Sequence, residues 1–471
     1  MEMSSVRIHN LTIRDFKNVE WGSIDFACSK TNSQKTVDIM GLYGQNGSGK
    51  TALIESLAVL KTVLCGQSIP DDYANYITID KQFSNMSFTF EIQSETETFK
   101  AKYSFALVKT EAEGESNIVN SDSTKQYRVT IANEVLSMSG MVAGKKQKWQ
   151  HLINTAPSDS PFVPQTKYAE VIGNSKVLKH QLMVYRKLTS QRSQSFIFYR
   201  DTLKTIRENC VVSEYTSILN ALVQYGNYGL HVIDTKSAGL INLNAALPFF
   251  FKLDSEQSLS VGSVAIQLNG SSTIPTQVYD VIQRVISNMN AVLEQIVPGL
   301  TVSLKQYGKA LLRDSREGCI VELMATRGGK AIPLRYESEG IKRIVSILQL
   351  LIVMYNNEGM TVAIDELDAG VFEYLFGELL KVVSESGKGQ LIFTSHNLRP
   401  LETIDKKFVY FTTTNPKNRY MQLENVKTNN NMRQLYYRRI SLGGQKEELY
   451  DLTNNYEIVL SFVEAGEFCV G

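Results

Sequence analysis

The stretch that decides the fold is TVDIMGLYGQNGSGKTALIESLAVL, residues 36–60. It opens with an apolar run over 36–43, passes into a glycine-rich loop and ends in a segment with apolar residues at helical spacing. The loop, residues 44–51, matches the pattern G-x-x-x-x-G-K-[ST] in full. A strand, such a loop and a helix in this order form a phosphate-binding loop. We therefore predict that a nucleotide binds here.

Each position of this loop has a physical reason. Glycines let backbone N–H groups turn inward around the phosphates, and the following helix offers its N-terminus to the anion. Lys50 adds a positive charge at the β- and γ-phosphate oxygens, and the Thr51 hydroxyl is a ligand for Mg²⁺. The predicted cofactors are ATP and Mg²⁺. The predicted ATP-binding residues of the loop are Gly44, Gln45, Asn46, Gly47, Ser48, Gly49, Lys50 and Thr51.

A second apolar run, TVAI at 361–364, ends in two carboxylates, Asp365 and Glu366. An acidic strand end is common by itself, but its pairing with a phosphate loop points to phosphoryl transfer. In that chemistry one carboxylate helps to hold Mg²⁺ and another positions the attacking water. We assign the metal to Thr51 and Asp365, and the role of catalytic base to Glu366, with Lys50 assisting catalysis.

Two further motifs narrow the class of ATPase to the ABC type. His396 follows the apolar run 391–394 and stands 30 residues after Glu366, a spacing typical of ABC ATPases, so we count it as catalytic. The stretch ESEGIKR, 337–343, lies 28 residues before Glu366 when counted from Ser338, where the ABC signature belongs. A helix N-terminus at this stretch would bind the γ-phosphate held by the opposite subunit. The predicted nucleotide contacts of this half are Ser338, Gly340 and, in the D-loop LDAG, Asp368.

The string SLGGQ at 441–445 looks closer to the LSGGQ signature than 337–343 does. It lies after His396, and no acidic strand end follows it. We interpret it as a surface turn and keep Ser338 as the signature serine.

The remaining patterns predict a mixed architecture. Loose alternation over 6–26 and β-branched, aromatic runs over 86–140 predict antiparallel strands. The segments 174–227 and 275–297 have helical spacing, and strands alternate with helices from 340 to 394, which predicts a mostly parallel sheet. The predicted fold class is α/β: an ABC-type P-loop ATPase head with a mixed or antiparallel N-terminal lobe, a parallel α/β core and a helical insertion.

We expect four parts along the chain. They are an N-terminal ATPase lobe (1–145), a mostly helical insertion that serves as partner or sensor lobe (146–310), a C-terminal ATPase lobe (311–415) and a C-terminal extension (416–471).

Composition sets limits on the class of protein. Basic and acidic residues nearly cancel, 49 against 48, so bulk charge gives no strong pull toward nucleic acid or membrane. The five cysteines form no Cys-x-x-Cys pair and no zinc spacing, which favours free thiols in a reducing compartment. Apolar runs are too short to span a bilayer, and no signal-peptide core opens the chain. We expect a cytoplasmic protein without a membrane partner.

Taken together, these motifs resemble the ABC-type ATPases related to SMC and RecF over about 1–140 and 320–415. The opening IHNLTIRDFKNVEWGSIDF, 8–26, is similar to the first strand pair of that family, whose Phe-Lys turn lies near the adenine. The resemblance implies that Arg14 and Lys17 touch the base or ribose. Read from the residues alone, they are equally well surface charges that flank a core Phe16.

More narrowly, SEGIKR, DELDAG and TSHN look like the compact ATPases of the OLD type and of anti-phage systems such as PARIS and Septu. OLD proteins carry a C-terminal Toprim nuclease, whereas the residues after His396 show no spaced acidic cluster for one. The resemblance thus implies a slow ATPase that dimerises around ATP, alone or in a larger oligomer of dimers. It would sense a phage-derived trigger and control a separate nuclease or toxin.

Other functions remain open at this point. A RecF- or SMC-like DNA repair ATPase is the alternative, and DNA binding is undecided. A transporter subunit is disfavoured by the long insertion between the phosphate loop and the signature. The Q-loop glutamine is not assigned; the candidates are Gln181, Gln191 and Gln194.

Overall fold

The computed structural model describes most of the chain and leaves short ranges aside. The described residues are 4–26, 38–94, 98–111, 127–142, 145–157, 159–234, 246–255, 258–267, 270–312, 315–424, 426 and 431–469. The stretch 112–126, which is acidic and serine-rich in sequence, lies outside them.

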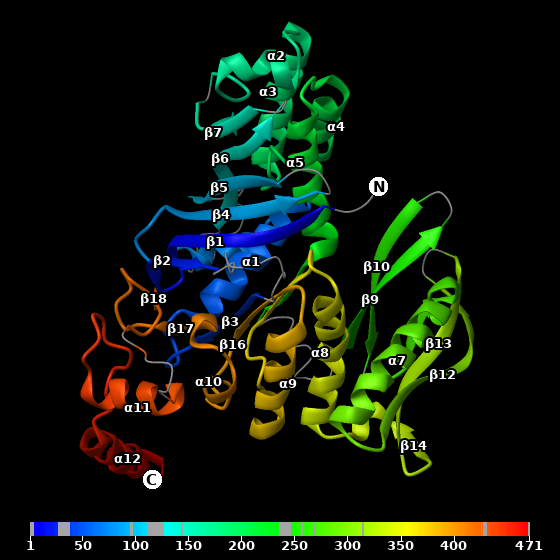
Figure 1. Cartoon of the computed structure of the whole chain (residues 1–471), viewed down its shortest axis with the longest axis vertical. Helices are drawn as coiled ribbons and strands as arrows, with labels where there is room; N and C mark the ends of the chain where they lie inside the picture. The colour runs from blue at the N-terminus through cyan, green and yellow to red at the C-terminus, as the bar shows by residue number, and fades with distance from the viewer. Residues whose placement is uncertain are drawn as a thin grey trace, which may run out of the picture.

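The centre of the molecule is a mostly parallel sheet in the order β18-β17-β3-β16-β15-β8. Figure 1 labels four of its strands, β18, β17, β3 and β16. Every pairing from β17 to β8 is parallel, and only the edge strand β18 is antiparallel. The six strands are β3 (Asp38–Tyr43), β8 (Leu230–Ile233), β15 (Thr361–Ile364), β16 (Gln390–Thr394), β17 (Val409–Thr412) and β18 (Tyr420–Met421).

These central strands are buried on both faces, which explains their unbroken apolar runs. Along β3, Met40 and Leu42 point into one hydrophobic core, while Ile39 and Tyr43 point into the other. Because side chains alternate along a strand, one short run supplies both cores. The sheet thereby fixes the loops at the carboxyl ends of its strands, where the sequence motifs lie.

The second sheet is antiparallel, in the order β2-β1-β4-β5-β6-β7. The predicted meander is confirmed, and it extends by one strand to residue 154. Burial alternates strictly along β4, as expected for a sheet with one face on the core. The strands are β1 (Ser5–Phe16), β2 (Val19–Asp25), β4 (Phe83–Gln93), β5 (Thr98–Glu111), β6 (Tyr127–Val142) and β7 (Lys145–Asn154).

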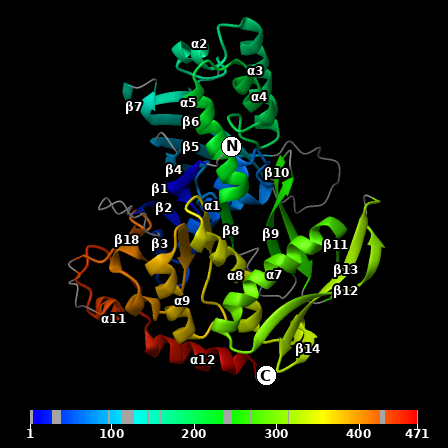
Figure 2. The same cartoon turned by 45° about the vertical axis from the view of Figure 1, so that its right-hand side comes forward.

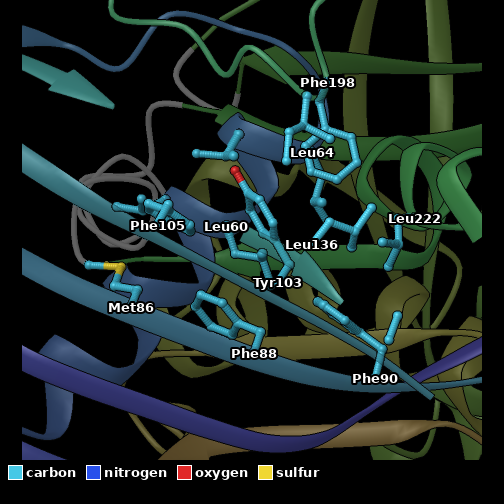
Figure 3. Packing of buried hydrophobic residues seen from close by; sticks show 14 of the residues in the cluster. Leu60, Leu64, Met86, Phe88, Phe90, Tyr103, Phe105, Leu136, Phe198 and Leu222 are labelled. Carbon is cyan, nitrogen blue, oxygen red and sulfur yellow. The ribbon is translucent and has the colours of Figure 1, made fainter. Parts of the chain in front are cut away.

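Helix α1 (Lys50–Leu64) lies between the two sheets and is buried along most of its length. Figure 3 shows Leu60 and Leu64 of this helix facing Phe88 and Tyr103 of the antiparallel sheet, with Leu222 of α5 beside them. Large aromatic side chains bury 150–250 Å² each, so they supply much of this core. The helices above the antiparallel sheet are α2 (Tyr168–Val171), α3 (Lys176–Gln191), α4 (Arg200–Asn209) and α5 (Ser213–Gln224).

The opposite face of the central sheet is covered by α8 (Glu339–Asn356) and α9 (Glu373–Ser386). A smaller lobe flanks them, in which α7 (Thr276–Ile296) packs on a small antiparallel sheet (Figure 2). The strands of that lobe are β9 (Ala246–Ser255), β10 (Ser258–Gln267), β11 (Ser272–Pro275), β12 (Leu300–Leu311), β13 (Glu317–Arg327) and β14 (Lys330–Pro333).

The range 146–310, expected to be mostly helical, contains strands as well as helices. Its residues 230–233 form β8, which pairs with β15 in the central sheet. Only tertiary pairing reveals this, because a four-residue apolar run after a helix carries no period of its own.

The chain closes with α10 (Pro400–Thr403), α11 (Met432–Leu442) and α12 (Asn455–Cys469). Short single turns lie at Asp71–Tyr76, Gln165–Lys167, Tyr225–Gly229, Leu334–Tyr336 and Lys406–Phe408. The predicted α/β fold class is confirmed: an antiparallel N-terminal sheet, a parallel core and inserted helices between them.

Two expectations about the chain as a whole can be set against this structure. Cys65, Cys210 and Cys319 are free thiols, as predicted; Cys28 lies outside the described residues. None of the described helices combines the length and the apolarity that crossing a membrane requires.

Candidate nucleotide site

The phosphate loop joins β3 to α1, as the sequence predicts, and Lys50 is the first residue of the helix. Its side chain is only 7 % exposed. The ammonium group donates to the backbone oxygens of Gly44, at 2.7 Å, and Gln45, at 2.8 Å. Lys50, at the end of the loop, is therefore tied to Gly44 and Gln45 at its start, which fixes the curvature of the loop.

Burial lowers the pKa of Lys50, and three carboxylates oppose that shift. They belong to Asp365, Glu366 and Asp368. Opposite charges act on a pKa only over short distances in a protein. The predicted metal ligand, base and D-loop residue thus share one electrostatic neighbourhood with Lys50.

The backbone of the loop approaches β17 closely at Gly44. A side chain there would place its Cβ 1.7 Å from Oγ1 of Thr412, and Gly44 has a φ of +152°, so only glycine fits. The Thr412 hydroxyl also bonds to the Ser48 hydroxyl, which in turn donates to Gln45 O at 2.6 Å. Thr412 therefore shapes the loop.

Other supports of the loop come from segments that carry no motif. Asn18 donates to the carbonyl oxygen of Gly47, and Tyr420 donates to that of Gly49 at 2.9 Å. Arg419 is buried, lies against Gly49 and donates to Asn18 O at 2.6 Å. Sequence reasoning missed Thr412, Arg419 and Tyr420, because nothing in the residues 409–421 indicates that they fold back onto the loop.

The acidic strand end is held in place by Thr394 of the neighbouring strand. Its hydroxyl donates to Oδ1 of Asp365 at 2.5 Å and accepts from the backbone N–H of Glu366 at 2.8 Å. Asp365 is 2 % exposed, whereas the Glu366 side chain is exposed and its backbone has a φ of +49°. The first carboxylate is thus fixed, and the second projects into solvent where a water could meet it.

The Asp368 side chain contacts the backbone of the segment that contains His396. Oδ2 of Asp368 accepts from the backbone N–H groups of His396, at 3.2 Å, and Asn397, at 2.9 Å. The His396 side chain is exposed. The D-loop aspartate therefore anchors the segment that carries the histidine.

The signature stretch lies at the start of α8. Ser338 is the N-cap residue of this helix, its hydroxyl accepts from Ile341 N at 3.4 Å, and its side chain is exposed. Gly340 touches the D-loop backbone so closely that a Cβ there would lie 2.3 Å from Gly370 O. No hydrogen bond within the described residues joins Ser338 to the phosphate loop of its own chain.

Arg343, also in α8, connects the signature helix to the acidic strand end. It is 3 % exposed and donates to the carbonyl oxygens of Asp365, at 3.2 Å, and Glu366, at 2.9 Å. Burial lowers its pKa, and the charges of Asp368, Glu366 and Asp365 oppose the shift. This arginine was quoted in the motif but given no role by the sequence.

The two residues assigned to the base or ribose have partners of their own. Arg14 is exposed and lies 3.5 Å from the Asp15 carboxylate. Lys17 pairs with Glu55 of α1, and its ammonium stands 4.3 Å from the centre of the Tyr76 ring. The turn itself does reach the loop, through Asn18. Nucleotide contacts by Arg14 and Lys17 stay predictions.

The three glutamines considered for the Q-loop lie on or just after α3. Gln181 donates to Tyr185, and Gln191 closes the helix. Gln194 donates to Gly66 O at 3.1 Å, just beyond the end of α1 opposite Lys50. A helix of that length places this end about 20 Å from the phosphate loop.

The donors at the site suit Mg²⁺. Asp365 offers a buried carboxylate, and the half-buried Thr51 offers a hydroxyl beside Lys50. No group of three His, Cys, Asp or Glu side chains within the described residues could hold a metal ion. Mg²⁺ commonly binds through one or two carboxylates and the phosphates of its substrate, so this donor set fits.

The turn at 441–445 behaves as expected. Ser441 and Leu442 end α11, and Gly443 and Gly444 have φ values of +66° and +82°. Most of it is exposed.

Comparison with known proteins gives a family match and several similar structures. Residues 10–243 match the AAA domain family. No curated protein matches the sequence. Among solved structures, the chain is similar to an SMC head bound to the C-winged helix domain of ScpA (12 % identity, 89 % of this chain and 98 % of that one, TM-score 0.41).

Two further structures cover the chain to a similar extent. The SMC head domain from Thermotoga maritima has 14 % identity over 89 % of this chain and 99 % of that one, with a TM-score of 0.37. The recombination mediator RecF with ATP has 13 % identity over 83 % of this chain and 94 % of that one, with a TM-score of 0.34. The range of the family match contains the phosphate loop, α1 and β8.

Proposed function

We propose that the chain is an ABC-type ATPase whose heads close on ATP in pairs. In this proposal it is the sensor and scaffold subunit of a bacterial anti-phage system that acts in the cytoplasm. It controls a separate effector, such as a Toprim-like nuclease or a toxin.

The ATPase part of the proposal rests on the electrostatic interaction of Lys50 with the carboxylates around it. A buried lysine, a fixed carboxylate on Asp365 and an exposed carboxylate on Glu366 act on one another at the mouth of a complete phosphate loop. Phosphoryl transfer needs little more from a protein than this positioning and charge stabilisation. When bound, Mg²⁺ would neutralise charge on the phosphate oxygens.

Each residue then has a defined task. Lys50 leaves the carbonyl oxygens of Gly44 and Gln45 and donates to the phosphate oxygens instead. Glu366 accepts a proton from the attacking water, and His396 donates to the γ-phosphate from the side. Thr394 holds Asp365 and the Glu366 backbone still while this happens.

The need for a second copy follows from the signature half. Ser338 is exposed and uses its hydroxyl only to cap α8. A helix N-terminus with such a cap readily binds an anion, and in this proposal the anion is the γ-phosphate on the partner head. Closure of the two heads would then affect the position of Glu366 in two ways. Arg343 of the signature helix donates to the Glu366 carbonyl oxygen, and Gly340 of the same helix packs against Gly370 of the D-loop.

The first experiment tests the base. Glu366→Gln should keep ATP binding and lower hydrolysis about 100-fold or more, because loss of a general base costs 10²–10⁴. Light scattering with ATP and Mg²⁺ should then show a stable dimer. Glu385→Gln, on the exposed far end of α9, is the matched control and should hydrolyse at the parental rate. Parental turnover by Glu366→Gln would refute the assignment.

A second experiment separates the defence role from the alternative, a RecF- or SMC-like DNA repair ATPase. Binding of the chain to duplex DNA is measured across a salt series. Tight binding that weakens steeply with salt indicates many phosphate contacts and favours repair. Weak binding, together with a nuclease or toxin gene next to this one, favours defence.

A further inference from the structure

The C-terminal segment after α11 is attached to the phosphate loop. The Gln45 side chain accepts from the backbone N–H of Asp451 at 2.8 Å and donates to its carboxylate at 3.3 Å. Gln45 lies inside the loop, and its own carbonyl oxygen accepts from Lys50 and Ser48. A contact made 406 residues away in sequence thus ends on a residue that nucleotide binding must disturb.

Further bonds hold this segment on the turn after β17. Glu447 accepts from the amides of Asn415 and Asn418, each at 2.9 Å. The carbonyl oxygen of Glu448 accepts from Thr414 N at 2.8 Å, and Leu449 is buried. The position of the segment is therefore set by the same turn that supports the loop.

Helix α12 begins four residues after Asp451 and makes a clear contrast. Its side chains from 455 to 466 are all exposed, and both views show the helix at the lower edge of the molecule (Figures 1 and 2). Tyr456 is 70 % and Phe462 76 % exposed. The exposed large apolar side chains are Tyr456, Ile458, Val459, Leu460, Phe462 and Val463.

These apolar residues cover most of the circumference of α12. At 100° per residue, Glu457, Ser461 and Glu464 share one narrow stripe, and the large apolar side chains spread over the rest of the circumference, with Asn455 among them. An ordinary surface helix has an apolar stripe just over 100° wide. A helix of 15 residues is also marginal in water unless it packs on something. We therefore expect the apolar surface of α12 to be covered by another protein surface.

Charge indicates what covers it. The charged residues of the stripe on α12, Glu457 and Glu464, are both acidic, and α11 of the same chain presents a complementary face. On α11, Tyr437 and Leu442 are exposed apolar residues, and Arg438 lies exposed between them. The other arginines of α11 are engaged: Arg433 pairs with glutamates, and Arg439 donates to Gly444 O. No ion pair or hydrogen bond of Arg438 occurs within the described part of the chain.

We propose that α12 binds α11 of a second copy of this chain. In a two-fold dimer each copy gives one α12 and receives one, so every such contact is made twice. The apolar arc of α12 covers Tyr437 and Leu442, and Glu457 and Glu464 face Arg438. Asp451, four residues before α12, is hydrogen-bonded to Gln45 of the phosphate loop. A change in the loop conformation would therefore move α12 and with it this contact.

The test uses the full chain without nucleotide, in sedimentation runs from about 0.5 to about 50 µM. Phe462→Asp should raise the dissociation constant of the dimer about ten-fold or more, as for a central interface aromatic. Val211→Asp is the matched control: it also places an acid on an exposed apolar position, but outside α12. Both variants should keep the parental circular-dichroism spectrum, since neither side chain is buried within its own chain.

A charge exchange then identifies the partner surface. Arg438→Glu alone and Glu457→Lys/Glu464→Lys alone should each weaken association about three- to five-fold, the size of exposed ion pairs. An equal mixture of the two should recover parental association, because both contacts of the mixed dimer then pair opposite charges. If Phe462→Asp associates like the parent, or if the mixture recovers nothing, the proposal is overturned.

This outcome can be told apart from the ATP-driven closure. Adding ATP and Mg²⁺ to Glu366→Gln reports on the heads, whereas the runs without nucleotide report on α12. Loss of one with retention of the other shows which of the two proposals has failed.

Discussion

The two halves of the proposed nucleotide site are built very differently. The phosphate-loop half is closed in on itself: Lys50 is buried, and Thr412 and Tyr420 hold the loop from the next strands. The signature half is open, with Ser338 exposed and bonded only to its own helix. In the proposed mechanism the first half binds the phosphates within one chain, whereas the second half, Ser338 and its helix, binds them from a second copy. The difference in burial between the two halves fits this proposal.

The largest effect is expected from Lys50→Ala, which removes a buried ammonium group that bonds to the loop itself. ATP binding should weaken at least about 100-fold, since the lost ammonium makes charge-assisted bonds in a buried site. Titration with a fluorescent ATP analogue measures this. Lys61→Ala, at the other end of α1, is the control and should bind like the parent. Equal affinity for both variants would contradict the role of Lys50.

Ser338→Arg should separate the two halves. The monomer should bind ATP with parental affinity, because Ser338 lies outside the phosphate-loop half. Closure should be lost, since a bulky cation now fills the position meant for the partner's γ-phosphate. Light scattering of Ser338→Arg combined with Glu366→Gln checks this, with Ser384→Arg on α9 as control. An ATP-dependent dimer in the combined variant would show that 337–343 is not the signature.

The stability of the fold should depend on pH through a buried histidine of the central sheet. Burial lowers the pKa of His231, on β8, from 6.5 to about 3, so this residue is neutral in the fold while the unfolded chain charges it. Between these values the unfolded state binds more protons, and stability falls as the pH drops below about 6.5. At pH 5 the cost is about 2 kcal/mol.

Replacing this histidine isolates its share of the acid sensitivity. His231→Leu should lose less stability between pH 7 and pH 5 than the parent, measured by urea unfolding at each pH. His180→Leu, on the surface of α3, is the control and should keep the parental pH dependence. Identical curves for His231→Leu and the parent would rule out this contribution.

The smallest effect concerns the support behind the loop. Thr412→Ala removes the hydroxyl that bonds to Ser48, and ATP affinity should fall about five-fold, equivalent to about 1 kcal/mol for one hydrogen bond. Thr412→Ser keeps the hydroxyl and should bind nearly as well as the parent. Should both variants bind equally, the loop does not need β17 for its shape.

Several features could be predicted from the sequence because their signals are local. The phosphate loop needs only glycines, Lys50 and the flanking strand and helix, all within residues 36–60. The same holds for the acidic end at 365–366 and for the helix N-cap at Ser338, whose residue types follow from strand burial and capping. The parallel core followed from the alternation of strands and helices.

What the tertiary structure decided is which distant segments meet. Thr412, Arg419 and Tyr420 support the loop, Arg343 ties the signature helix to Asp365, and Asp451 holds Gln45. Residues 230–233 complete the central sheet. None of these pairs has a sequence period, since contact between them depends on how strands and loops are ordered in space. The sequence by itself determined the chemistry of the site, and the packing of remote segments decided its shape.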